Sequence, residues 1–344
     1  MRRIQLKLAL PAAALFTLSA CADNAPVTGP DVQSAVVAAA PSGNRLATME
    51  WQGSTPVLYI QNPDGSGRVR VHFDHVTDHV IGNYSPKLLP VTDESIMRFV
   101  NLEWSPDGRY LAVMLGVATD ALEIVLVSAD GRALRTISPN SQYLWGGIDW
   151  SPDSRRITYI MATGPFGRAA DVFMTELGRD LVTRVTTGMN LSGYDAVRFD
   201  ASGTRIIFTQ HTGWAPDGVN VASRIGTVDL NTGTIKFGDD VIGEPQGFAR
   251  DGSFALFIRT DPTTFVRELV RRPSDGSRET VLATGNLGGL SIIDGERQAV
   301  LSEWDRSGSV QSFSVIGLSN ANDVVASLKT DPTAVGAVLR APLQ

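Results

Sequence analysis

Apolar residues in this chain occur in short runs separated by turn-forming residues. Residues 104–113, WSPDGRYLAV, show the pattern most clearly, because an apolar-rich segment at 99–104 precedes a Ser-Pro-Asp-Gly turn and a second such segment follows at 110–113. Ser suits the first position of a type I turn, Pro presets φ at the second, and Gly closes the turn without a steric cost. The stretch therefore predicts a β-hairpin corner.

Weakened copies of this corner recur along the chain, with WSPDSRRITYI at 150–160 the most similar. With the turn glycine or its equivalent as marker, the copies fall at Gly43, Gly108, Ser154, Gly203, Gly252 and Gly295. Neighbouring markers are 43 to 65 residues apart, and the mean spacing is about 50. This period is typical of the blades of a β-propeller.

A second hairpin with a glycine-containing turn follows most of the corners. Examples are residues 57–71, 124–137, 225–237 and 268–282. Corner and hairpin together give four antiparallel strands per repeat, as in a propeller blade. A seventh blade would need more residues than the chain offers. We therefore expect an all-β fold: a six-bladed β-propeller of four-stranded antiparallel blades over residues 32–344.

The strand that closes the ring has two candidates. Residues 32–39 have the composition of an innermost strand for blade one, with 323–329 as the outermost strand of blade six. Alternatively, residues 334–339 supply the closing strand. Either arrangement would cover an edge that would otherwise invite aggregation.

The WSPDG corner followed by a glycine-containing hairpin resembles the TolB-type propeller repeat. The resemblance covers nearly all of the chain after its first 31 residues, and the copies at 104 and 150 are the most specific. TolB itself has an α/β domain before its propeller, whereas about ten residues precede it here, which implies a TolB-like propeller other than TolB. Members of the family serve as partner-binding platforms at the cell envelope, as substrate-gating domains of peptidases and, in a few cases, as enzymes.

The first 20 residues have the pattern of a signal peptide. Arg2, Arg3 and Lys7 precede an apolar segment at 8–20, which is too short to span a bilayer comfortably. The segment ends in LSAC and resembles the lipobox of bacterial lipoproteins, with Cys21 as the only cysteine of the chain.

In that family the cysteine is acylated and becomes the first residue, which anchors the protein to a membrane. We therefore expect a signal peptide at 1–20 and a lipidated tether at 21–31, rich in Gly and Pro. Ala22 stands where an aspartate favours inner-membrane retention, so the expected location is the outer membrane, facing the periplasm.

Composition excludes some partners and reveals little catalytic chemistry. A net charge of −6 and a pI near 5.3, with basic residues scattered, argue against nucleic acid. No Gly-x-Ser-x-Gly elbow, phosphate-binding loop, calcium loop or paired-cysteine zinc motif occurs. The sequence therefore predicts no cofactor, apart from the metal hypothesis below.

Three of the four histidines fall within residues 72–79, HFDHVTDH. On a helical turn His75 and His79 would share a face, which His72 could join, and a divalent metal could bind there. In an extended strand no site would assemble, and the segment would be a solvated polar loop. The segment also lacks the glutamate of the His-Glu-x-x-His signature.

Connection topology gives candidate binding residues. In a propeller, the connections between blades and those between the two middle strands open on one face. Three such connections are expected: the insertion 72–98, residues 210–223 and residues 164–170. The candidates are Asp74, His75, His211 and Trp214, although Trp214 could instead pack under its own loop.

The favoured function is a non-catalytic envelope lipoprotein, monomeric, whose propeller mouth binds a protein partner or a small ligand. The alternative is a propeller enzyme of hydrolase or lyase type, metal-assisted, with its site at the same mouth.

Overall fold

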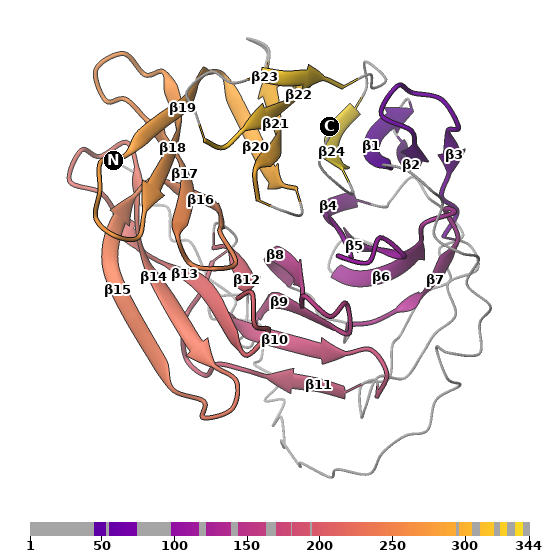
Figure 1. Ribbon diagram of the computed structural model, residues 1–344, viewed down its shortest axis with the longest axis horizontal. Helices are drawn as coiled ribbons and strands as arrows, with labels where there is room; N and C mark the ends of the chain where they lie inside the picture. Colours follow the sequence, from indigo (N-terminus) through magenta and orange to yellow (C-terminus); the bar gives the residue numbers. More distant parts are fainter. Residues whose placement is uncertain are drawn as a thin grey trace, which may run out of the picture.

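The computed structural model describes residues 45–52, 55–73, 98–116, 122–138, 144–162, 170–179, 181–192, 195–293, 296–304, 310–319, 324–328 and 334–339. These residues form six four-stranded antiparallel sheets arranged as a ring (Figure 1). The predicted all-β, six-bladed propeller is confirmed. The described part of the chain contains no helix long and apolar enough to cross a membrane.

Blades two to four follow the chain in order, each from the innermost strand outward. Blade two contains β4 (Arg98–Trp104), β5 (Tyr110–Gly116), β6 (Leu122–Ser128) and β7 (Ala133–Thr136). Blade three contains β8 (Leu144–Trp150), β9 (Arg156–Ala162), β10 (Ala170–Glu176) and β11 (Leu181–Arg184). Blade four contains β12 (Val197–Phe199), β13 (Arg205–Trp214), β14 (Val221–Asp229) and β15 (Ile235–Ile242).

Blades five and six repeat this order. Blade five contains β16 (Glu244–Phe248), β17 (Phe254–Thr260), β18 (Arg267–Pro273) and β19 (Thr280–Gly285). Blade six contains β20 (Leu287–Ile292), β21 (Gln298–Trp304), β22 (Val310–Gly317) and β23 (Val324–Ser327). The predicted outermost strand of blade six at 323–329 therefore corresponds to β23.

Blade one closes the ring with both ends of the described chain. Its order is β24 (Ala334–Leu339), β1 (Leu46–Gln52), β2 (Thr55–Gln61) and β3 (Val69–Arg70). β24 pairs antiparallel with β1, with Leu46 opposite Leu339. The alternative in which residues 334–339 close the ring is thus the one observed, and residues 32–39 lie outside the described residues.

The corner at 104–113 is built as its sequence predicts. The N–H of Gly108 donates to the carbonyl of Ser105 at 2.8 Å, and Gly108 has a φ of 67°. The Ser105 hydroxyl donates to Asp107 Oδ1 at 2.7 Å and accepts from the N–H of Tyr110 at 3.0 Å. The polar residues of the corner therefore hold its own backbone.

The left-handed position of the corner does not always carry glycine. Equivalent positions in blades three to six are Ser154 (59°), Gly203 (67°), Gly252 (74°) and Glu296 (57°). In blade six the N–H of Glu296 donates to the carbonyl of Ile293, so Glu296 occupies the position for which the sequence predicted Gly295. That marker was displaced by one residue; Gly295 itself and Gly43 lie outside the described residues.

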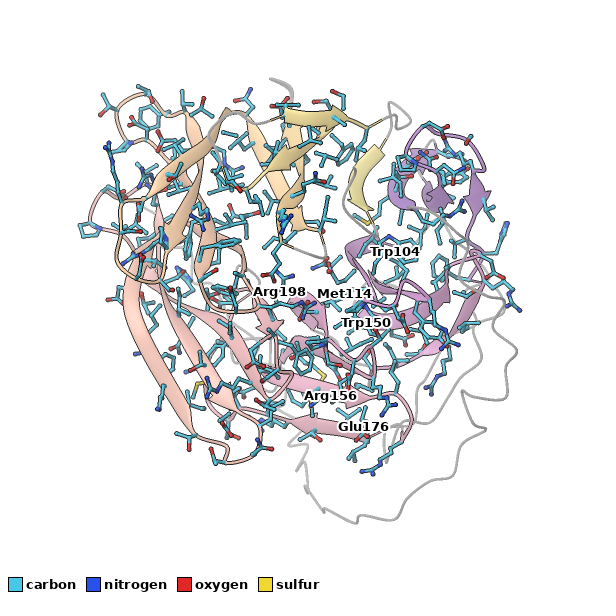
Figure 2. All side chains as sticks on the ribbon, viewed as in Figure 1. Trp104, Met114, Trp150, Arg156, Glu176 and Arg198 are labelled. Carbon is cyan, nitrogen blue, oxygen red and sulfur yellow. The ribbon has the colours of Figure 1, made fainter. Side chains whose placement is uncertain are left out.

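Apolar clusters fill the interfaces between blades. Trp104 belongs to the cluster between blades one and two, Trp150 to that between two and three, and Phe199 to that between three and four. Trp150 and Phe199 are fully buried. Figure 2 shows Trp104 and Trp150 between their blades and Arg198 nearer the ring centre. Burial of these aromatic side chains supplies much of the contact between neighbouring sheets.

Neighbouring corners are also joined directly by hydrogen bonds. These run from the Asp107 N–H to Ser154 Oγ (3.1 Å), from the Arg156 guanidinium to the Gly203 carbonyl (2.8 Å), from the Ala201 N–H to the Arg250 carbonyl (2.8 Å), and from the Arg250 N–H to Glu296 Oε1 (2.6 Å). Blades two to six are thereby linked corner to corner.

A buried charge network crosses the same end of the ring. Arg250 of blade five donates to both oxygens of Asp149 in blade three, at 3.0 and 2.9 Å. The Asp149 carboxylate also accepts from the N–H of Phe199 at 2.8 Å. Arg198 of blade four lies 3.7 Å from Asp149 and 3.2 Å from Glu296 of blade six. Four blades therefore contribute to one network.

Burial raises the pKa of the Asp149 carboxyl, while the guanidiniums of Arg250 and Arg198 act in the opposite direction. Burial also raises the pKa of Glu296, against the influence of Arg198. The ionised carboxylates therefore depend on their arginine partners.

Replacing Arg250 by Met should lower the free energy of unfolding by about 3–5 kcal/mol at pH 7, because Asp149 loses its bidentate partner. The pKa of Asp149 then rises further, so the folded state takes up a proton where the unfolded state does not. The loss should consequently shrink as the pH falls through that raised pKa. Urea unfolding at pH 7 and pH 5 measures both effects.

Arg155→Met, at an exposed arginine of the neighbouring corner, is the matched control and should be nearly neutral. An equal loss of unfolding free energy at both pH values in Arg250→Met would contradict the inferred rise in the pKa of Asp149.

Candidate partner-binding face

The hairpin of β13 and β14 extends the face opposite the corners. Pairing continues from Arg205 opposite Asp229 to Trp214 opposite Val221, with a register shift between His211 and Gly213. Residues 210–223, expected as a loop, are therefore mostly regular hairpin. The glycines and the proline of this segment indicated a loop, but strand pairing extends past Gly213 because the register shift accommodates it.

The turn at the end of this hairpin is fixed to blade five. Within it, the N–H of Gly218 donates to the carbonyl of Ala215 at 2.9 Å. The Asn220 amide donates to the carbonyl of Thr260 at 2.8 Å, and its Oδ1 accepts from the N–H of Thr260 at 2.7 Å. These two hydrogen bonds attach the projecting hairpin to blade five and limit its movement.

The turn between β17 and β18 presents an exposed aromatic ring. Asp261 Oδ1 accepts from the N–H groups of Thr264 at 2.7 Å and Thr263 at 2.9 Å, which lowers the pKa of Asp261. The N–H of Phe265 donates to the carbonyl of Asp261 at 2.8 Å, and Phe265 has a φ of 57°. A bulky residue in the left-handed region is strained by roughly 1–2 kcal/mol.

Large exposed apolar side chains gather at the connections of blades four to six on this face. We call the following set the hairpin patch: Trp214 (70% exposed), Ile242 (50%), Phe265 (70%), Val266 (41%) and Trp304 (40%). Blades four, five and six are consecutive in the ring (Figure 1). Large exposed apolar side chains on one face of three consecutive blades make this face a candidate interaction surface.

Charged side chains connect the parts of the hairpin patch. The Arg267 guanidinium lies 5.6 Å from the centre of the Trp304 ring and donates to Glu244 at 2.8 Å. Arg259 pairs with Glu268 and with Glu279, each at 2.9 Å. Charged groups therefore lie beside Trp304 and on blade five, and polar groups of this kind are typical of the rim of a protein interface.

The structure separates the predicted site residues. Trp214 is exposed and does not pack under its own hairpin, whereas His211 is half-buried and its ring N–H donates to the carbonyl of Gly213 at 2.6 Å. His72 is exposed, and its backbone forms an isolated bridge with Arg132.

Several other candidates lie outside the described residues: Cys21, Asp74, His75, His79 and residues 164–169. The metal hypothesis for His72, His75 and His79 therefore stays a prediction. Among the residues that the structure does describe, no group of three or more His, Cys, Asp or Glu is placed to hold a metal ion.

A small cavity occupies the channel at the ring centre. Its volume is about 100 Å³, and Glu103, Asp149 and Arg198 are among its lining residues. Each of the three directly precedes the interblade aromatic residue of its own strand, and alternation along the strand puts it on the opposite face. The ion pair between Asp149 and Arg250 spans the corner end of the channel.

Sequence reasoning missed Ile242, Phe265, Val266 and Trp304. The Asp261-Pro262 pair indicated a turn before Phe265, but a turn signal does not say which side chain is exposed. From the sequence alone, the side chain of Phe265 would be predicted to lie in the core.

Sequence comparison does not identify the chain: no protein-family model matches it. No curated protein matches it either.

Solved structures share its fold. TolB from Acinetobacter baumannii superimposes with a TM-score of 0.64 at 15% identity, covering 87% of this chain and 67% of that one. A chain of a nidogen/laminin complex gives a TM-score of 0.57 at 11% identity, covering 86% of this chain and 98% of that one. The tricorn protease gives 0.54 at 13% identity, covering 86% and 30%.

The fold and the comparisons place the chain among the six-bladed β-propellers. Within that class its fold is similar to the propeller of TolB, in agreement with the resemblance of its corner repeats. At these identities the likeness concerns the fold and does not assign a function.

Replacing Phe265 by Asn should leave the free energy of unfolding unchanged or raise it by up to about 1 kcal/mol, because Asn tolerates the left-handed region. Urea unfolding measures the change. Phe254→Asn, at a buried ring of the same blade, is the control and should destabilise by roughly 3–5 kcal/mol. A comparable loss for Phe265→Asn would mean that its ring supports the fold.

Proposed function

We propose that this protein is a non-catalytic, lipid-anchored binding platform of the bacterial cell envelope, and that the hairpin patch contacts a protein partner. The observation that carries the proposal is Phe265, which is 70% exposed in a left-handed conformation. Because the ring is exposed, its burial contributes little free energy that could offset the backbone strain. Strain of this kind is found where a side chain serves a function.

The composition of the hairpin patch suits a protein partner. Trp and Phe are enriched in interfaces, and buried aromatic anchors contribute most of the binding energy. The Asn220–Thr260 bonds fix the hairpin before binding, so little conformational freedom would be lost on association. The expected free form is a monomeric propeller.

The N-terminal sequence supports the envelope location. The leader at 1–20, the lipobox-like LSAC and Cys21 predict attachment to a membrane, and the resemblance to TolB-type repeats agrees with an envelope protein. The tether at 21–31 would span at most about 40 Å when extended. The propeller would then work close to the membrane surface, on the periplasmic side of the outer membrane.

Replacing both aromatic anchors should remove the partner. The unmodified chain and the Trp214→Ser, Phe265→Asn variant are each used to capture proteins from an envelope extract. The variant should capture at least about thirtyfold less of the partner, because one hot-spot aromatic contributes about 2 kcal/mol or more. Quantitative mass spectrometry of the captured proteins measures the loss. Leu181→Ser, at a residue 46% exposed on the outer strand of blade three, is the control. Equal capture by the double variant would refute the assignment of the patch.

Replacing Cys21 by Ser should move the chain from the membrane fraction to the soluble periplasmic fraction, because acylation needs the thiol. Fractionation followed by mass measurement of the N-terminal peptide checks both location and acylation. An unchanged distribution, or an unmodified cysteine in the membrane-bound chain, would contradict lipid anchoring.

A further inference from the structure

A crevice separates blades four and five and reaches the corner side of the ring. Its volume is about 380 Å³, and the connections at Gly252 and Gly276 border it. We propose that this crevice binds a small amphipathic carboxylate, with the apolar body inside and the carboxylate between Lys236 and Arg272. The proposal does not depend on the proposed function.

The floor and walls of the crevice are apolar. Ile207, Val241, Phe248 and Ala255 line it and are each less than a tenth exposed. A cavity of this size and lining falls within the range of small-molecule sites, about 300–1,000 Å³ with a few polar groups among apolar walls.

Small residues leave this interface incompletely filled. Gly238, Gly252 and Ala255 line the crevice, so few side-chain atoms are available to fill the space between the two blades. Among the described residues, the buried cluster between blades four and five has five members, whereas that between two and three has thirteen. The space is therefore a consequence of which residues the two blades place at their interface.

Phe237 borders the crevice, but its ring packs against Phe208 on the face of blade four that is turned toward blade three. The Arg224 guanidinium lies 3.8 Å from the centre of its ring, and the ring meets Phe208 edge-on, with 6.0 Å between centroids. Phe237 is 38% exposed although it is held on these two sides. The apolar lining of the crevice therefore comes from Ile207, Val241, Phe248 and Ala255, and not from this ring.

The charges at the crevice are of one sign. Among the described residues that line it, Lys236 and Arg272 are the charged ones and none carries a carboxylate. The Arg272 guanidinium donates to the carbonyl of Asp240 at 3.2 Å, and within the described part of the chain neither cation forms an ion pair. A ligand carboxylate would complement the positive charge of Lys236 and Arg272. The arginine guanidinium can donate two parallel hydrogen bonds to such a carboxylate.

Naphthalene-2-carboxylate and its uncharged isostere naphthalene-2-carboxamide test the proposal. Each ligand is titrated calorimetrically into the full chain, and the heat of diluting the ligand into buffer alone is subtracted. We expect one carboxylate per chain and at least fivefold weaker binding of the carboxamide. Equal affinities, or no binding of the carboxylate, would overturn the proposal.

Gly238→Trp blocks the crevice without backbone strain. A Cβ at Gly238 would have its nearest contact at 3.7 Å, with the carbonyl of Ile225, and the φ of Gly238 is outside the left-handed region. We expect at least tenfold weaker binding of the carboxylate. Gly178→Trp, where a Cβ meets nothing within 4 Å, is the matched control and should bind normally. Unchanged binding by Gly238→Trp would place the ligand elsewhere and overturn the proposal.

A charge variant completes the test. Lys236→Gln with Arg272→Gln should reduce carboxylate affinity to that of the carboxamide and leave carboxamide affinity unchanged. Circular dichroism confirms that each variant is folded. Retained preference for the carboxylate in this variant would refute the role of the two cations.

Discussion

The ion pair between Asp149 and Arg250 is the constraint on which much of the ring depends. The two residues belong to blades three and five, and Arg198 from the intervening blade contacts the same carboxylate. Strand pairing holds each sheet together, but among the described residues neighbouring sheets share no strand, so side-chain packing and hydrogen bonds between blades fix their relative position. A buried charge is tolerated only with its full set of partners. The network therefore requires blades three to six to be in place together.

This constraint explains why two corners depart from the repeat. Arg250 stands where blade two has Pro106, and Glu296 occupies the left-handed position that Gly108 fills in blade two. Viewed as copies of WSPDG, both look degenerate. In the structure they supply the guanidinium that pairs with Asp149 and the carboxylate that accepts the Arg250 N–H. The departures thus place charged groups at the end of the channel, while Ser154 makes a similar corner-to-corner bond in the more regular part of the ring.

The sequence predicted what depends on local pattern and missed what depends on distant contacts. Period and turn chemistry were enough for six blades, for the left-handed Gly108, and for the face on which Trp214 lies. They could not choose between residues 32–39 and 334–339 as the closing strand, because both segments are apolar and extended in pattern. They could not foresee that Asp149 meets Arg250, which is 101 residues away, nor that Phe265 is exposed. Exposure depends on which neighbours the ring brings together, and a single chain segment does not contain that information.

The two ends of the propeller consequently have different roles. At the corner end, substitutions disturb hydrogen bonds or buried charges shared by several blades, so few sequences are compatible with the ring. At the opposite end, the hairpins project beyond the core, and the Asn220–Thr260 bonds stabilise them without restricting the side chains they present. Trp214 and Phe265 can therefore be exposed at little cost to the interfaces below them. Because the corner end fixes the scaffold, residues at the opposite end can change to form a binding surface. The functional proposal therefore rests on residues that differ between blades and not on the repeated corner.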